Sequence, residues 1–456
     1  MYLFFLLRKV KYYIVLNITY TSKGEYMKES SIWLENIKMN EFPILNNDMS
    51  TDVLIIGGGI SGILCAYELK KRNIDCVVLE KGKIGQATSK DTTAFLTIHH
   101  EKLYVDLINE LGKDKAKEYL CLNQGALDKY KELSKEFDFD YKEESSIIYT
   151  YEEIDKIFKE RDVLLDLGIE AEIINELPLK LNIKAGLKVN NCATIHPLKL
   201  INELSKGLTI YEETKIVKLK KNRAITNRGN YISFSNVVIC THYPIHNVKG
   251  LYFPRLTQRK SYVVNLKHDQ IEGMYTNLED RGLYYRSYYN NLIVGGNDRD
   301  TKETCIHNFL ERIKATFPNN EILNYWSGQD CITLDGVPYI GRFDAFHDNY
   351  YVVTGFNLWG YTWAMASSKI IADLLEKRKK YPLVDPLRVI INKQLFSNLG
   401  TSFKNLFTFR RPRCSHMGCA LNYNKEERVY ECPCHGSRFD KQGNVLNEPA
   451  KKNKNL

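Results

Sequence analysis

Residues 51–80 read TDVLIIGGGISGILCAYELKKRNIDCVVLE and have the form of a complete β-α-β unit. The apolar run VLII is typical of a buried parallel strand. Gly57-x-Gly59-x-x-Gly62 then allows a tight turn, close approach of a pyrophosphate and close helix–strand packing. The second strand ends at Glu80, the acid expected on a ribose hydroxyl. With all these parts in register, the unit predicts a dinucleotide site rather than a glycine turn without nucleotide.

The composition is that of a soluble globular protein. The 456 residues suffice for two or three cores, and 44% hydrophobic with 26% charged residues is ordinary. The net charge of +9 comes from scattered lysines without a sustained arginine and aromatic platform, so we expect a solvated basic surface and no nucleic-acid partner.

The N-terminus begins with an apolar run that stops at Arg8 and Lys9. It is too short to span a bilayer, and its charges follow the apolar stretch instead of preceding it as in a signal peptide. We therefore expect no transmembrane segment and interpret residues 1–29 as a dispensable extension, with a natural start at Met27. The protein is predicted to be cytoplasmic, and loose membrane association through this run is the alternative.

A second informative stretch, RCSHMGCALNYNKEERVYECPCHGSRF, covers residues 413–439. It contains Cys414-x-His416 and Cys432-x-x-His435, so two loops each present one thiol and one imidazole. Such a set suits tetrahedral zinc, or a 2Fe-2S cluster with cysteines on one iron and histidines on the other. Each loop also carries one further cysteine, and this matched pair, which zinc does not need, favours the cluster.

This segment resembles the Rieske proteins of the cytochrome bc type. The resemblance implies that Cys414, His416, Cys432 and His435 are ligands of a 2Fe-2S cluster, that Cys419 and Cys434 form a disulfide, and that Ser437 donates a hydrogen bond to a cluster sulfur. Two features depart from that pattern. Phe439 stands where a tyrosine is common, and only the basic stretch LFTFRRPR precedes the first ligand. We therefore expect a shortened module that rests on the rest of the protein, with this basic, aromatic stretch packed against the larger domain.

Residues 348–380, DNYYVVTGFNLWGYTWAMASSKIIADLLEKRKK, form a second glycine-bearing segment with the pattern strand, turn, long helix. Together with ATIHPLKL, VVICTHYPI and GQDCITLDGVPYIG, it makes residues 30–380 resemble the FAD-dependent oxidoreductases of the D-amino-acid oxidase and glycine oxidase superfamily. The resemblance implies FAD, which the first unit alone does not distinguish from NAD. The loop IGQATSKDTTAF departs from close relatives at Ala87, Lys90 and Phe95.

The resemblance also assigns individual residues to the cofactor. A core aromatic is the competing interpretation of the tryptophan among them. The implied positions are Gly57, Gly59, Gly62 and Glu80 at the pyrophosphate and ribose, Ile216 at the adenine, Thr92 and Thr93 beside the flavin, and Gly355, Trp359, Gly360 and Thr362 over the isoalloxazine.

The predicted fold class is α/β, or α+β overall: a Rossmann-like FAD-binding domain with an antiparallel-sheet substrate domain, plus a small all-β or loop module for the cluster. Residues 100–190 have the pattern of amphipathic helices, and residues 246–320 that of antiparallel strands. We interpret the seven dispersed cysteines as buried thiols in a reducing compartment. The predicted domains are residues 30–380 for the oxidoreductase, 381–412 for a linker and 413–456 for the Rieske module.

A flavin that accepts a hydride and a cluster that carries one electron together predict a dehydrogenase. The resemblance implies an amine or amino-acid substrate and an external acceptor such as a ferredoxin-like carrier or a quinone. Arg286 and Arg259 are candidates for binding a substrate carboxylate, and ordinary surface ion pairing is the competing interpretation. The alternative function is a non-enzymatic redox sensor or electron carrier. A Rieske oxygenase is disfavoured because the chain lacks the D/E-x-x-H-x4-H pattern of its iron site.

Overall fold

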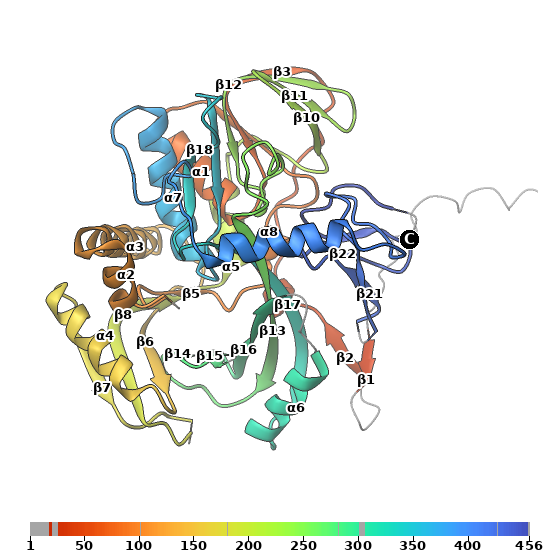
Figure 1. The fold of residues 1–456 in the computed structure, drawn as a ribbon. Coiled ribbons are helices and arrows are strands. Elements are labelled where there is room, and N and C mark those ends of the chain that lie inside the picture. The colour runs from red at the N-terminus through yellow and green to blue at the C-terminus, as the bar shows by residue number, and fades with distance from the viewer. Residues whose placement is uncertain are drawn as a thin grey trace, which may run out of the picture.

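The computed structural model describes residues 18–20, 26–100, 102–179, 181–280, 282–300, 306–425 and 427–454. One sheet carries the predicted dinucleotide unit, in the order β10-β11-β12-β3-β4-β9, with β19 beside β12 and β18 beside β19 (Figure 1). Its central pairs, β12 with β3 and β3 with β4, are parallel, which suits apolar strands buried on both faces. The strands are β3 (Met49–Ile56), β4 (Cys76–Leu79), β9 (Ile210–Tyr211), β10 (Ile216–Lys220), β11 (Arg223–Thr226), β12 (Tyr231–Ile239), β18 (Tyr339–Arg342) and β19 (Tyr350–Thr354).

The second sheet is larger and mostly antiparallel, in the order β1-β2-β17-β13-β16-β15-β14-β6-β8-β5, with β7 beside β8. Two of its pairs, β14 with β6 and β17 with β2, are parallel. The antiparallel strands expected within residues 246–320 are present. The strands are β1 (Ile18–Tyr20), β2 (Tyr26–Glu29), β5 (Phe95–Leu96), β6 (Lys142–Thr150), β7 (Ala171–Ile174), β8 (Ala185–Thr194), β13 (Leu256–Lys267), β14 (Met274–Asn277), β15 (Leu283–Tyr288), β16 (Asn291–Asp300) and β17 (Ile322–Thr333).

Helices α1 and α7 pack together against the first sheet, and α3 packs against α7. Their buried side chains, among them Ile63, Leu69 and Trp363, belong to the largest apolar core, which continues between the two sheets. The described helices are α1 (Ile60–Lys71), α2 (Tyr104–Leu111), α3 (Lys113–Leu133), α4 (Ile154–Asp166), α5 (Pro197–Ser205), α6 (Ile306–Thr316), α7 (Gly360–Leu375) and α8 (Lys393–Leu406). None of these helices is long and apolar enough to cross a bilayer.

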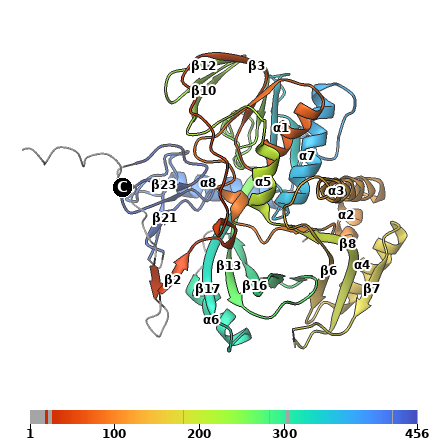
Figure 2. The same cartoon turned by 180° about the vertical axis from the view of Figure 1, so that it is seen from behind.

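The C-terminal residues form a small sheet of four strands beside the two larger ones, as both views show (Figures 1 and 2). These are β20 (Asn422–Asn424), β21 (Val429–Glu431), β22 (Arg438–Phe439) and β23 (Val445–Asn447), each paired antiparallel with the next. Helix α8 crosses the front of the molecule in Figure 1 and ends beside this sheet. The predicted fold class is confirmed.

Two predictions about the larger domain were wrong in part. Residues 100–190 hold three helices but also β6, β7 and β8, because the β-branched and aromatic residues of SSIIYT favour a strand paired on both sides. Cys121 is exposed although two leucines flank it, since helical periodicity turns it away from the core that buries Leu120. Cys65, Cys192, Cys240 and Cys331 are buried as expected, Cys76 is half-buried, and Cys305 lies outside the described residues.

The predicted extension, residues 1–29, is described only in its strands. Residues 1–17 and 21–25 lie outside the described residues. Strand β1 pairs with β2, and β2 joins the edge of the larger sheet beside β17. That the extension is dispensable stays a prediction.

Candidate functional site

A cavity of about 770 Å³ lies between the two large sheets. Its lining comes from the β3–α1 turn, the end of β4, the loop of residues 86–93, strands β13 and β17, and the loop before α7. Gly62 and Thr362, of the predicted FAD residues, are not part of its lining. Those that line it are Gly57, Gly59, Glu80, Thr92, Thr93, Ile216, Gly355, Trp359 and Gly360.

The glycine turn leaves no space for a side chain at Gly57 or Gly62. Gly57 has φ +113°, and a Cβ there would lie 2.4 Å from the carbonyl oxygen of Cys240. A Cβ on Gly62 would lie 1.9 Å from the carbonyl oxygen of Gly57, so Gly62 is needed for helix–strand packing. The Glu80 carboxylate accepts hydrogen bonds of 2.8 Å from the backbone N–H groups of Gly58 and Gly82, and burial raises its pKa. This geometry fits a pyrophosphate at the N-terminus of α1.

The loop before α7 forms the other end of the cavity. Gly355 has φ +74°, and a Cβ there would lie 2.3 Å from the Thr333 methyl group. The Trp359 ring stacks on the buried His100 ring at 4.8 Å, and its indole nitrogen has no hydrogen-bond partner among the described residues. The Asn357 N–H donates to the carbonyl oxygen of Cys331, which fixes this loop beside β17. Trp359 both lines the cavity and packs against the largest apolar core, so it fits the cofactor and the core interpretation alike.

Two carboxylates that the sequence analysis did not identify, Asp330 and Asp91, line the same cavity. Burial raises the pKa of Asp330 to about 7 and that of Asp91 to about 6, although the nearby Arg259 and Lys90 charges lower them. Asp330 is the cross-strand partner of Arg259, and all four residues line the cavity. Asp330 lies within GQDCITLDGVPYIG, one of the segments that carry the family resemblance, so this resemblance could have pointed to it.

Of the two candidate arginines, only Arg259 lines the cavity. Arg286 is 1% exposed, and its Nη1 donates to the carbonyl oxygens of Ala94 (2.9 Å) and Thr93 (3.2 Å). It also donates to Ile195 O at 3.3 Å. Arg286 therefore supports the loop that carries Thr93 from behind, and the structure does not support substrate binding by this residue.

The four predicted cluster ligands lie together in the C-terminal module. The rings of His416 and His435 are 5.0 Å apart between centroids, and Cys414 and Cys432 lie in one small buried core. His416 Nε2 lies 2.8 Å from Asn247 Oδ1, whereas its Nδ1 and both ring nitrogens of His435 have no hydrogen-bond partner among the described residues. Buried polar atoms without partners are costly and rare. The donor set therefore fits a metal cluster held by these four residues.

The neighbouring side chains were placed differently from the prediction in one respect. Cys419 and Cys434 are free thiols in the structure, with their sulfurs and that of Cys432 within 4.8 Å of one another. The predicted disulfide is thus not formed in the structure and stays a prediction for the cluster-loaded protein. Ser437 is fully buried, and its hydroxyl accepts a hydrogen bond of 3.0 Å from the Ala450 N–H. Phe439, also fully buried, packs in one small apolar core with Cys414 and Cys432.

The module rests on the larger domain, as expected for a shortened one. Tyr243 and Phe253 pack edge-on against His416 and His435, at 6.2 and 6.1 Å between ring centroids. The amides of Gln258 and Gln329 donate to the carbonyl oxygens of Glu448 and Gly436. Residues 445–451 of the module line the cavity that the glycine turn lines. The two predicted cofactor sites therefore share a wall.

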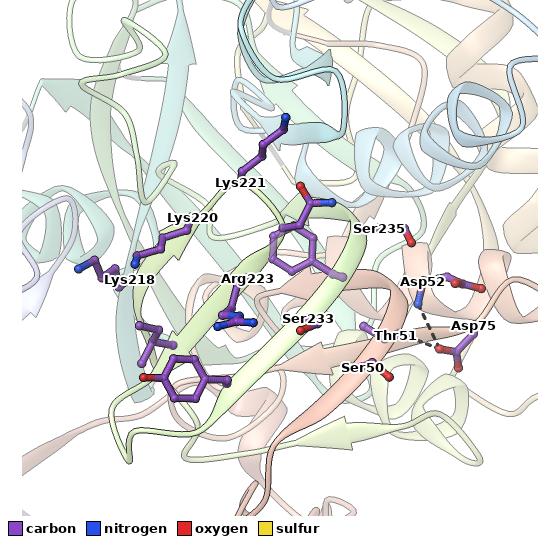
Figure 3. Close-up of a pocket in the computed structure, with 14 residues that line it drawn as sticks. Ser50, Thr51, Asp52, Asp75, Lys218, Lys220, Lys221, Arg223, Ser233 and Ser235 are labelled. Atoms are coloured by element: carbon purple, nitrogen blue, oxygen red, sulfur yellow. Dashed lines mark hydrogen bonds between the residues drawn. The ribbon is translucent and has the colours of Figure 1, made fainter.

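A second hollow, of about 940 Å³, lies over strands β10 to β12. Figure 3 shows Lys218, Lys220 and Lys221 extending outward from these strands, with Thr51 and Asp52 hydrogen-bonded to Asp75 on the other side. None of the predicted site residues lines it, and its cations are on the surface, so we assign no site there.

Residues 52–374 match the family described as DAO, FAD dependent oxidoreductase. The chain belongs to this family. Residues 389–455 match the Rieske [2Fe-2S] domain, so the oxidoreductase binds FAD in its larger domain and a 2Fe-2S cluster in its C-terminal module. Which residues hold each group stays a prediction.

The oxidoreductase is similar to the putative Rieske 2Fe-2S iron-sulfur protein YhfW of Bacillus subtilis, with 30% identity over 92% of this chain and 95% of that protein. Its fold is similar to L-proline dehydrogenase from P. horikoshii, with 20% identity over 75% of this chain and 98% of that one, at a TM-score of 0.65. Glycine oxidase from Geobacillus kaustophilus has 18% identity over 75% of this chain and 99% of that one, with the same TM-score.

Proposed function

We propose that the oxidoreductase is an amine or amino-acid dehydrogenase that passes its electrons through the Rieske cluster to an external one-electron acceptor. The donor loses two electrons and two protons across a C–N bond and becomes an imine, which water then hydrolyses. FAD supplies the two-electron chemistry when bound, and the cluster supplies one-electron transfer.

The observation that carries this proposal is the shared wall. Residues 445–451 line the cavity together with Gly57, Gly59 and Glu80. The segment from Cys240 to Tyr243 begins in the cavity lining and ends against the ring of His416. A protein whose two centres served separate partners would not need its cluster ligands turned towards its own flavin domain.

The charges in the cavity support an amine donor. Asp330 and Asp91 offer carboxylates to an ammonium group, and Arg259 offers a guanidinium to a carboxylate. The solved neighbours are named for proline and glycine, both amino acids.

Gln258 and Gln329 attach the Rieske module to the cavity wall, since both amides are buried and donate to the module's backbone.

The test is anaerobic addition of a panel of amines and amino acids to the holoprotein, with flavin absorbance and cluster EPR recorded on the same sample. We expect one subset of compounds to bleach the flavin and also to produce the reduced-cluster signal. His435→Cys should still bleach with the same compounds but should lose electron delivery to an added acceptor. If no compound bleaches the flavin while photoreduction reduces both centres, the redox sensor or carrier function is the correct one.

A further inference from the structure

Helix α8 presents its aromatic side chains to solvent. Phe396, Phe403 and Phe407 are 64%, 63% and 66% exposed. At 3.6 residues per turn they fall within about 40° of one another around the helix axis, so they form one continuous stripe. The rings of Phe403 and Phe407 stack at 6.2 Å. Phe409, 76% exposed, lies just beyond the helix. The expectation that this stretch packs its aromatic residues against the larger domain was therefore wrong.

Polar contacts help to hold α8 to the protein. Asn392 caps the helix and donates to Leu334 O at 2.7 Å, and Asn398 donates to Pro254 O at 3.0 Å. Ser402 is its one buried residue. The carbonyl oxygen of Asn405 accepts from Ala420 N–H. Leu395, Leu399 and Leu406 are half-buried on the same side, so α8 has one apolar side against the protein and a second, the phenylalanine stripe, left exposed.

The charge around the stripe has one sign. Residues 387–413 contain six arginine and lysine residues and no acid: Arg388, Lys393, Lys404, Arg410, Arg411 and Arg413. Arg388 is paired with Asp335, and Arg413 donates to carbonyl oxygens at the end of α8. Lys393 and Lys404 lie about 60 to 80° around the axis from the stripe, on its flank.

We propose that α8 is an interfacial helix that docks the protein on an anionic lipid surface, with Phe396, Phe403 and Phe407 in the boundary between headgroups and acyl chains. An apolar stripe with flanking lysines and arginines is the pattern of such helices. A second copy of the chain fits less well, because a two-fold contact through the stripe would bring the same lysines near their own copies. Neither a signal sequence nor a spanning helix is required for this contact.

Docking through α8 would bring the Rieske module close to the membrane. The Cys434 thiol lies 3.9 Å from Thr401 O, and Leu406 packs against the apolar core that contains Cys414, Cys419 and Cys432. The ligand loops therefore lie directly behind α8, about one helix diameter of 10–12 Å from the proposed lipid surface. A lipid-soluble acceptor such as a quinone is within reach there. This use rests on the proposed function, whereas the docking does not.

The test is flotation of the full-length holoprotein with vesicles of phosphatidylcholine, with and without about 30% phosphatidylglycerol. We expect binding to the anionic vesicles that weakens with salt. The triple substitution Phe396→Ser, Phe403→Ser, Phe407→Ser should lower the partition coefficient at least tenfold. Lys393→Glu with Lys404→Glu, which leaves the stripe intact, should also reduce it. The matched control is Phe346→Ser, which removes an 88% exposed phenylalanine elsewhere and should have no effect.

Several results would overturn the docking. One is equal binding by the triple variant and wild type, and another is absence of binding to either vesicle. A concentration-dependent dimer that the triple variant abolishes would assign the stripe to a second copy. Saturable binding of an acidic protein, without lipid binding, would assign it to a protein partner. A protein that floats with vesicles but oxidises no amine would refute only the proposed function.

Discussion

Glu427 joins the Rieske module to the larger domain through a buried ion pair. Lys260 on β13 has a side chain only 1% exposed, and its Nζ lies 2.6 Å from both carboxylate oxygens of Glu427. Tyr262 and Arg438 also donate to this carboxylate. Burial and the Arg438 charge lower the pKa of Lys260 to about 8, although Glu427 raises it. We expect Glu427→Gln to loosen the module.

The size of the effect follows from two parts. Without the carboxylate the pKa of Lys260 falls further. Each pKa unit of that fall destabilises the folded protein by about 1.4 kcal/mol until the pKa passes the solution pH, so at pH 7 a fall from about 8 contributes about one such unit. Loss of the charge-assisted bond to Arg438 adds about 1.5–3 kcal/mol. The sum, about 3–4 kcal/mol, is in the usual range of about 3–5 kcal/mol for a broken buried ion pair.

The pH dependence has a definite sign. The pKa of Lys260 is lower in the folded state than in the unfolded chain, so the unfolded chain binds more protons. The folding stability therefore rises with pH. Wild type loses the Lys260 proton near pH 8, and the variant, without the Glu427 charge, should lose it at a lower pH. Well above pH 8 both folded forms hold a neutral lysine, so the destabilisation at pH 9 should be smaller than at pH 7.

The assay is hydrogen exchange of the holoprotein, read on peptides that cover residues 422–447. About 3 kcal/mol corresponds to roughly a hundredfold loss of protection in this module, with peptides from β3 and α1 unchanged. Glu143→Gln, which breaks the exposed pair with Lys131, is the matched control and should change protection by less than about tenfold. A loss of under tenfold for Glu427→Gln, or equal losses at pH 7 and pH 9, would refute the reasoning.

Gly59→Asp should abolish FAD binding, since a carboxylate would meet the pyrophosphate, and flavin released on denaturation measures this; normal flavin content would contradict the nucleotide site. His435→Cys should remove the low average g value that marks a Rieske centre in EPR of the reduced protein, and an unaltered spectrum would exclude His435 as a ligand. Phe439→Tyr should raise the cluster potential in protein-film voltammetry, because a new hydrogen bond to a ligand sulfur stabilises the reduced form; an unchanged or lower potential would show that residue 439 does not face the cluster. Asp330→Asn should raise KM for a cationic amine at least tenfold and remove the rise in kcat/KM near pH 7, where the carboxyl of wild type ionises; a retained rise would assign that ionisation to another group.

The parts that the sequence predicts well are those set by local pattern. The glycine turn, Glu80 and the two ligand loops each lie within one short segment, so spacing alone brings their residues together. Asn247 could not be found in this way, because its contact with His416 joins residues 169 positions apart. Phe253 and Glu427 act across the same interface. The strand of Arg286 was predicted, but the burial of its side chain against backbone carbonyls depends on how a distant loop folds.

The wall formed by residues 445–451 has a consequence for biogenesis. Apart from Asn453 of the same module, every other part of the cavity lining precedes this segment in the chain, so during synthesis the flavin pocket is complete on all sides but one. Residues 445–451 then complete the pocket. Their placement depends on the folding of the C-terminal module, whose core contains the predicted cluster ligands Cys414 and Cys432. Retention of FAD should therefore depend on the iron supply, and protein from iron-starved cells should lack both FAD and the 2Fe-2S cluster.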